Sequence, residues 1–128
     1  MKKRWISWLL AALVLTGCAA EKIDTSYEQI NAEAAKAVMD QQPEAVVLDV
    51  REPHEFENGH IPGAVLLPLG TIAEDTAAAV IPESDTTVLI YCRSGNRSKQ
   101  AASALYELGY TNLYEFGGIN DWPYDVTD

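Results

Sequence analysis

The chain has 128 residues, of which 19 are acidic and 9 basic, a formal net charge of −10 at pH 7. This excess of acid argues against nucleic acid as a partner, because binding to a phosphate backbone depends on clustered Lys and Arg. The two cysteines, Cys18 and Cys92, do not have the paired Cys or Cys/His spacing of a zinc site, so no metal site is predicted.

The amino-terminal segment is predicted to lie outside the folded domain. Residues 2–4 are basic, and residues 5–16 form an apolar run that is too short to span a bilayer comfortably. Residues 15–18, with the sequence Leu-Thr-Gly-Cys, resemble a bacterial lipobox. That resemblance implies that residues 1–17 are a lipoprotein-type signal peptide and that Cys18 becomes the site of lipidation.

Lipidation at Cys18 predicts attachment to a membrane of the bacterial cell envelope, outside the cytoplasm. An ordinary secretory signal and a short uncleaved anchor are the alternatives, and both also predict an extracytoplasmic domain. With Cys18 acylated, Cys92 is the only free thiol, so neither an intramolecular disulfide nor a dithiol redox cycle can form. Without residues 2–4, six basic residues remain against nineteen acidic ones, a net charge of −13.

Residues 18–26 are predicted to form a lipid-attached tether, and residues 27–128 are long enough for one compact domain. Asn31 is the predicted N-cap of a first helix, whose apolar positions run from residue 32 to residue 39. Pro43 follows the expected end of this helix, where a proline is common.

The next segment predicts a buried strand with an acidic residue inside it. Residues 45–50 are a nearly continuous apolar run, which is typical of a parallel strand covered on both faces. Burying Asp49 is costly unless its carboxylate is paired or hydrogen-bonded. Arg51 is the nearest candidate partner along the chain.

Short elements follow this strand. Residues 52–57 predict a short helix with Pro53 in its first turn. Residues 59–63 form a turn cluster, and residues 64–67 predict a second short strand. His60, inside the turn cluster, could serve as a general base, but a histidine that ties a turn to its neighbours is the favoured interpretation.

The remaining elements complete an alternating pattern. Residues 70–82 predict a helix with a loop, and residues 112–115 a short final strand. Gly117 and Gly118 predict a turn, after which residues 119–122 form a helical turn that packs a tryptophan against the domain. Strands that alternate with helices predict an α/β fold, a small parallel sheet flanked by helices on both faces.

The strongest functional signal lies in the carboxyl-terminal third of the chain. Residues 88–91 are apolar and mostly β-branched or aromatic, which is typical of a buried strand. A polar loop over residues 92–97 follows, and from Ser98 onward apolar residues recur at helical spacing up to Gly109, the predicted helix stop. Cys92 therefore lies at the carboxyl end of a strand just before a helix, where ligands bind in open α/β sheets.

The loop composition favours a thiolate at Cys92. Gly95 allows the backbone to curl so that successive N–H groups point inward, and the following helix directs its positive end to the same point. Arg93, Arg97 and Lys99 lie in or beside the loop and are three of the six basic residues that remain after the leader. The alternatives are a buried structural cysteine and an ordinary solvated helix start; the crowding of Gly and Arg around one thiol favours an anion site.

The segment from Cys92 to Ser98, Cys-Arg-Ser-Gly-Asn-Arg-Ser, resembles the active-site loop of rhodanese-type sulfurtransferases. Three further segments resemble the same family in the same order: Leu-Asp-Val-Arg-Glu at 48–52, Gly-His-Ile-Pro-Gly-Ala at 59–64, and Phe-Gly-Gly-Ile-Asn-Asp-Trp at 116–122. The resemblance extends from about residue 27 to residue 122 and implies a rhodanese-like fold.

The resemblance also implies a function. A thiolate at Cys92 is expected to take the sulfane sulfur of thiosulfate or of a persulfide donor and pass it to cyanide, a small thiol or a protein cysteine, without a cofactor. Asp49, Arg51 and His60 are expected to support the site, the first two as a structural pair near the loop. The residues expected to bind the anionic sulfur donor are Arg93, Ser94, Gly95, Asn96, Arg97 and Ser98.

Two alternative functions remain open. The loop from Cys92 to Arg97 has six residues, the length that resembles sulfurtransferases, whereas related phosphatases and arsenate reductases carry one residue more. A cysteine-dependent phosphatase or arsenate reductase is therefore the less favoured enzyme class. A tethered sulfur-binding or partner-binding module without fast turnover is the alternative outside enzymes, although the intact cysteine and loop favour catalysis.

Overall fold

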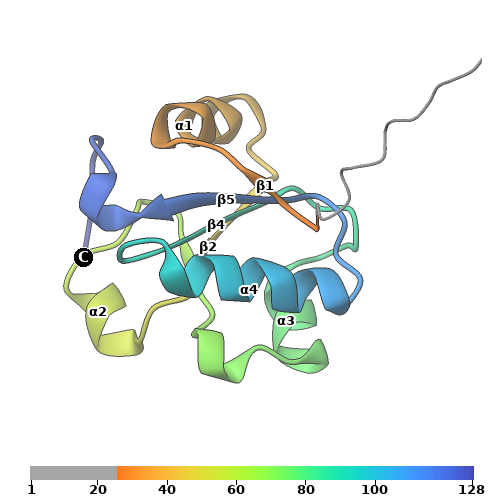
Figure 1. Cartoon of the computed structure of the whole chain (residues 1–128). Coiled ribbons are helices and arrows are strands. Elements are labelled where there is room, and N and C mark those ends of the chain that lie inside the picture. Colours follow the sequence, from red (N-terminus) through yellow and green to blue (C-terminus); the bar gives the residue numbers. More distant parts are fainter. Residues whose placement is uncertain (1–25) are drawn as a thin grey trace, which may run out of the picture.

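A computed structural model describes residues 26–128, so the predicted signal peptide, Cys18 and nearly all of the tether lie outside the described residues. A single five-stranded sheet in the order β1-β5-β4-β2-β3 runs through the domain, and all of its strand pairs are parallel (Figure 1). The strands are β1 (Glu28–Gln29), β2 (Val46–Asp49), β3 (Val65–Leu66), β4 (Val88–Cys92) and β5 (Leu113–Gly118).

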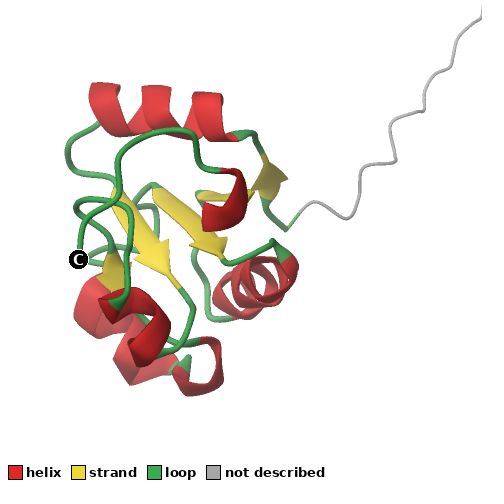
Figure 2. Ribbon diagram, turned by 90° about the vertical axis from the view of Figure 1, so that its left-hand side faces the viewer, coloured by secondary structure: helices red, strands yellow, loops and turns green. Residues whose placement is uncertain are grey.

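Helices cover both faces of this sheet, as the alternating pattern predicted (Figure 1). Helix α1 lies on one face, and α3 and α4 lie on the other. The short helix α2 lies near the carboxyl end of the sheet, where the strands point out of the page in Figure 2. The helices are α1 (Ala32–Gln41), α2 (Pro53–Glu57), α3 (Glu74–Val80) and α4 (Asn96–Glu107), with 3-10 turns η2 (Leu69–Thr71) and η3 (Ile119–Asp121). None of the described helices is long and apolar enough to cross a membrane.

The central strand β4 divides the core into two layers. All five of its residues are buried, and they alternate between the faces because a strand has a period of two. Leu89 and Tyr91 pack on the α1 side, whereas Val88, Ile90 and Cys92 pack on the side of α3 and α4. The side chain of Cys92 is thereby directed toward the side of the sheet on which α4 lies.

Two predicted helix ends are confirmed by their geometry. The side chain of Asn31 accepts a hydrogen bond of 2.8 Å from the backbone N–H of Ala34, as an N-cap does. Gly109 follows the C-cap of α4 at φ +106°, a left-handed conformation in which a glycine avoids a Cβ clash.

The structure corrects two predicted boundaries. Helix α4 begins at Asn96 rather than at Ser98, because the left-handed Gly95 completes the curl of the loop two residues earlier. Gly117 and Gly118 do not form a turn; they are the last residues of β5, which runs on until Gly118 is in register with Cys92. A register shift between Ile90 and Cys92 accompanies this extension. Strand β1 was not predicted, because its two residues are exposed and carry no apolar pattern.

Candidate active site

Cys92 is the last residue of β4 and lies at the bottom of the loop that leads into α4. Its exposed fraction is only 1%, and among residues 26–128 it is a free cysteine. Figure 2 shows this edge of the sheet from the carboxyl ends of the strands, where the connecting loops gather. The sulfur of Cys92 is therefore almost completely shielded from solvent.

The backbone of the loop directs a hydrogen-bond donor, an N–H group, toward the sulfur of Cys92. The N–H of Gly95 donates a hydrogen bond of 3.0 Å to Cys92 Sγ. Gly95 has φ +113°, and a Cβ there would lie 3.3 Å from Lys99 Nζ and 3.6 Å from Gly117 Cα. A glycine is therefore required by conformation, and the curl it allows forms an anion-binding nest around the sulfur.

The environment of Cys92 favours its charged form. Burial raises the pKa of the thiol, but the Ser98 hydroxyl and the backbone N–H groups of Ser98, Gly95 and Ser94 lower it, so the net pKa shift is downward. This agrees in direction with the thiolate expected from the sequence. The causes that lower the pKa of Cys92 are therefore hydrogen bonds to its sulfur.

A buried carboxylate that is not among the predicted site residues lies behind the sulfur. Glu115 on β5 is 2% exposed, and its Oε2 lies 2.5 Å from the hydroxyl of Ser98. That hydroxyl oxygen is in turn 3.4 Å from Cys92 Sγ. The signal available in the sequence was the position of Glu115 two residues after Leu113, on the inward side of a predicted strand.

Arg97 does not present a free charge to the loop. Its guanidinium forms a two-pronged ion pair with Glu55 of α2, at 2.8 and 3.0 Å. The hydrogen bond from Arg97 lowers the pKa of Glu55 to about 2, and the same bond raises the pKa of Arg97. The charge on Cys92 also raises the pKa of Arg97. The guanidinium therefore interacts with the sulfur, although Glu55 compensates most of its positive charge.

The remaining loop residues form the mouth of the site. Arg93, Ser94 and Asn96 are exposed, and Lys99 Nζ reaches back to the carbonyl oxygen of Gly95 at 3.2 Å. A cleft of about 570 Å³ opens beside this mouth. Its lining includes Arg51, His54, Glu55, Arg93, Asn120 and Trp122. The lining of this cleft thus carries two arginine side chains, Arg51 and Arg93, close to the loop that starts at Cys92.

Asp49 and Arg51 form the predicted pair beneath this cleft. Arg51 donates to both carboxylate oxygens of Asp49, with the shortest contact 2.7 Å, and also to the carbonyl oxygen of Gly59 at 2.7 Å. Burial lowers the pKa of Arg51, but the bonds to Asp49 outweigh it, and the net shift is upward. The pair ties the end of β2 to the following turn and so supports the floor of the cleft.

His60 ties its turn to two neighbouring segments. Its ring stacks on Phe56 with centroids 3.7 Å apart, and its Nδ1 lies 2.9 Å from the Phe56 carbonyl oxygen. Its backbone pairs with Thr127 through bonds of 2.7 and 2.8 Å. These contacts match the favoured interpretation of His60, and none of them brings the ring to Cys92.

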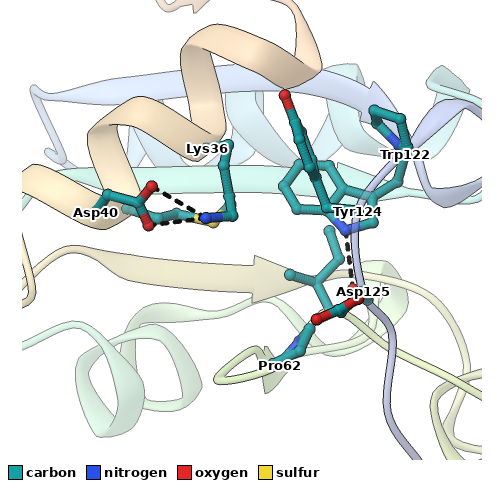
Figure 3. A pocket seen from close by; sticks show the side chains of 9 residues that line it. Lys36, Asp40, Pro62, Trp122, Tyr124 and Asp125 are labelled. Atoms are coloured by element: carbon teal, nitrogen blue, oxygen red, sulfur yellow. Dashed lines mark hydrogen bonds and ion pairs between the residues drawn. The ribbon is translucent and has the colours of Figure 1, made fainter.

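A second groove of about 620 Å³ lies on the α1 side of the sheet (Figure 3). It shares Trp122 and Tyr124 with the cleft beside the loop, and Lys36 pairs with Asp40 along its edge. No residue from 92 to 98 lines this groove, so the larger of the two depressions is not where the thiol chemistry lies. Residues 26–128 also contain no cluster of His, Cys, Asp and Glu that could hold a metal ion.

Comparison with known proteins agrees with the geometry of the site. Residues 31–124 match the Rhodanese-like domain family. The chain is 40% identical over 74 residues to the thiosulfate sulfurtransferase PspE of Escherichia coli (strain K12), which covers 58% of this chain and 70% of PspE. It is 35% identical over 99 residues to the thiosulfate sulfurtransferase GlpE of Pseudomonas syringae pv. syringae, covering 77% and 89% of the two chains. A solved structure described as "rhodanese with anions from E. coli" aligns with a TM-score of 0.61 and 32% identity, over 66% of this chain and 98% of that chain.

Proposed function

Because this chain belongs to the rhodanese-like domain family and is a rhodanese-type enzyme, we propose that it transfers sulfane sulfur through a persulfide on Cys92. The donor is thiosulfate or another small anion that carries a sulfane sulfur. The acceptor is cyanide, a small thiol or a protein cysteine. The observation that carries the proposal is the Cys92 sulfur at the centre of a hydrogen-bonding loop, 3.0 Å from the N–H of Gly95.

The first half of the cycle is a displacement at sulfur. The Cys92 thiolate attacks the outer sulfur of thiosulfate, the S–S bond of thiosulfate breaks, and sulfite leaves with the electron pair. The new terminal sulfur carries the negative charge and lies among the N–H groups of the loop, which stabilise it as they stabilise the thiolate.

The second half returns the enzyme to its starting state. A nucleophilic acceptor attacks the terminal sulfur, the S–S bond to Cys92 breaks, and Cys92 leaves as a thiolate. Low thiolate basicity makes Cys92 a good leaving group, so the hydrogen bonds that lower its pKa assist both halves of the cycle.

Two features favour sulfur transfer over phosphate ester hydrolysis. Cys92 is almost fully buried, and Arg97, which would have to hold the oxygens of a phosphoryl group, is held by Glu55. A single terminal sulfur needs less room inside the loop than a phosphorus atom with three equatorial oxygens. Sulfur transfer from thiosulfate is therefore favoured over hydrolysis of a phosphate ester.

Trapping the intermediate tests this proposal. Purified protein mixed with thiosulfate and analysed intact by mass spectrometry is expected to gain one sulfur atom, which cyanide then removes. The Cys92→Ser variant, which preserves the size of the side chain, is expected to gain none. A wild-type protein that never carries extra sulfur, or a serine variant that still does, would contradict the proposal.

We further propose that the domain is held at a membrane outside the cytoplasm by a lipid on Cys18, as the lipobox-like residues 15–18 suggest. The mature protein is then expected to partition into detergent, and Cys18→Ser is expected to release it or to leave the leader uncut. Membrane-bound wild-type protein that retains residues 1–17 would contradict lipidation and indicate an uncleaved anchor.

A further inference from the structure

We infer that the cleft beside the Cys92 loop is the acceptor site, and that the acceptor it fits is a thiol that carries both a carboxylate and an apolar chain. The inference rests on the proposed persulfide chemistry and deepens it, because it names the groups that recognise the acceptor. Arg93 binds the carboxylate, and Tyr124 and Val126 of the carboxyl-terminal segment cover the apolar chain.

The cleft borders the place where the persulfide forms. Its lining includes Arg93, the residue that follows Cys92, and Asn120, whose backbone N–H donates a hydrogen bond of 3.1 Å to the Arg93 carbonyl oxygen. Because Cys92 is only 1% exposed, the thiol of an acceptor has to enter the loop while the rest of the acceptor stays outside it. The cleft is the depression beside the loop in which that remainder fits.

The cleft is larger than the reactants of the simplest sulfur transfer require. Its volume of about 570 Å³ lies within the range of ligand-binding pockets, roughly 300–1,000 Å³. Cyanide and thiosulfate have only a handful of heavy atoms each and would leave most of this space empty. A thiol that carries a chain of several carbon atoms has a size that matches the cleft.

Part of the lining is hydrophobic and comes from the end of the chain. Tyr124 is 39% exposed and Val126 is 53% exposed, and both line the cleft beside the partly buried Trp122. Isolated hydrophobic side chains on a surface are common, but these residues gather in one depression next to the reactive loop. An apolar chain that covers them removes carbon surface from water, which is favourable in proportion to the area buried.

This hydrophobic wall is held in place before an acceptor binds. Trp122 Nε1 donates a hydrogen bond of 3.0 Å to the Asp125 carbonyl oxygen (Figure 3). Thr127 pairs with the backbone of His60 through bonds of 2.7 and 2.8 Å. The segment is therefore fixed on both sides of Val126, so that little conformational entropy is lost when a ligand packs against it.

The polar part of the lining carries one uncompensated charge. Arg51 is paired with Asp49, and Glu55, the acidic residue of the lining, is paired with Arg97. Arg93 is exposed and forms no ion pair with the residues that the structure describes. In a chain with so large an excess of acidic residues, this free guanidinium attracts a carboxylate on the acceptor.

The transfer step balances without a further reactant. The acceptor thiolate attacks the terminal sulfur of the persulfide, the S–S bond to Cys92 breaks, and its electron pair stays on Cys92 Sγ. The acceptor leaves as a persulfide, and the number of negative charges is the same before and after. Sulfite has left before the acceptor enters, so Arg93 is free to serve the donor and the acceptor in turn.

Discharge of the persulfide-loaded protein tests the inference on the second half of the cycle alone. Protein is loaded with thiosulfate, separated from it, and mixed with a low concentration of one thiol, while mass spectrometry follows the loss of the extra sulfur. Mercaptohexanoate is expected to discharge the protein at least about tenfold faster than mercaptopropionate, which lacks three methylenes, or mercaptohexanol, which lacks the carboxylate. Equal rates for the three thiols would overturn the inference.

Variants assign each preference to its residue. Val126→Ser is expected to reduce the preference for mercaptohexanoate over mercaptopropionate by about threefold or more. Arg93→Gln is expected to reduce the preference for mercaptohexanoate over mercaptohexanol to a similar degree. Val65→Ser is the matched control, because Val65 is an exposed valine on β3 that does not line the cleft. Each preference is a ratio measured on one variant, so general damage to the loop does not change it; a variant that keeps its full preference would overturn the inference.

Thr127→Pro provides a second readout. It removes the N–H that bonds to His60 and so releases the segment, although every side chain of the cleft is retained. Thr127→Ala keeps both backbone bonds and is the control. The proline variant is expected to lose the preference for the longer thiol, and the alanine variant to keep it; a proline variant with the wild-type preference would overturn the inference.

Failure of the inference differs from failure of the proposed function. Protein that gains sulfur and is discharged by cyanide, but shows no preference among the three thiols, would overturn the inference and leave the proposed function intact. Protein that never gains sulfur would overturn both.

Discussion

Gly118 lies directly against the backbone of Arg93, so that a β-carbon at this glycine would be only 2.0 Å from the Arg93 carbonyl oxygen. The same oxygen accepts a hydrogen bond of 3.1 Å from the N–H of Asn120. The end of β5 therefore forms one wall of the loop that begins at Cys92. The backbone of the active-site loop is positioned by a strand that follows it in sequence.

Replacement of Gly118 by Ala is expected to push this wall and the loop apart. Overpacking of this kind costs about 1–3 kcal/mol of stability, and displacement of the loop N–H groups should lower kcat/KM for thiosulfate at least about tenfold. Gly70→Ala is the matched control, because Gly70 has open space at its Cβ position and no positive φ. Urea unfolding and thiosulfate kinetics of both variants measure the two effects. A Gly118→Ala protein as active as Gly70→Ala would show that Gly118 does not position the loop.

The thiol of Cys92 is expected to ionise more readily in the folded protein than in the unfolded chain. Its pKa is lowered by hydrogen bonds that exist only when the loop is folded, even though burial acts in the opposite direction. Alkylation by iodoacetamide as a function of pH, compared between native protein and protein in urea, measures the difference. The native midpoint is expected to be lower; an equal or higher native midpoint would contradict the account.

Arg97→Ala is expected to reduce kcat/KM for thiosulfate about ten- to a hundredfold, whereas Lys99→Ala should cost less than about threefold. Part of the Arg97 effect comes from Glu55, which loses its partner and is left as an uncompensated negative charge beside the anion site. A double variant with both Arg97 and Glu55 changed to Ala should therefore recover part of the lost rate. Equal losses in the two single variants, at low and at high salt, would contradict this assignment.

The ion pair between Glu55 and Arg97 is expected to make the free energy of unfolding depend on pH in the acidic range. Because the pKa of Glu55 falls from 4.5 to about 2 on folding, its stabilisation is fully present above about pH 4.5 and is lost as the pH falls toward 2. Glu55→Gln should thus cost about 1 kcal/mol at neutral pH, less than the full pKa shift implies because solvent screens the pair. The exposed Glu57→Gln on the same helix is the control, and urea unfolding at several pH values is the measurement. A deficit in Glu55→Gln that persists undiminished near pH 2 would argue against the pair.

The local parts of the site could be predicted from the sequence. The strand that ends at Cys92, the glycine that curls the loop and the helix that follows are determined by neighbouring residues. The same holds for the pairing of Asp49 with Arg51, two positions apart. The α/β class followed from alternating strand and helix patterns, which each segment carries by itself.

Side-chain contacts between residues on different helices and strands could not be predicted. Glu115 meets Ser98 across 17 residues, and Glu55 meets Arg97 across 42 residues. No local pattern encodes these contacts, because they depend on the order of the strands in the sheet. For the same reason the sequence alone predicts a turn at Gly117 and Gly118. Only the packed fold shows that Gly118 must lack a side chain to fit against Arg93.

Thiocyanate formation from thiosulfate and cyanide tests the central claim most directly. The wild-type protein is expected to form thiocyanate catalytically, and Cys92→Ser is expected to form none above the uncatalysed rate. An aryl phosphate offered to the same preparations is expected to be hydrolysed negligibly. Aryl phosphate turnover that rivals thiocyanate formation and disappears in Cys92→Ser would contradict the account and assign the loop to phosphate chemistry.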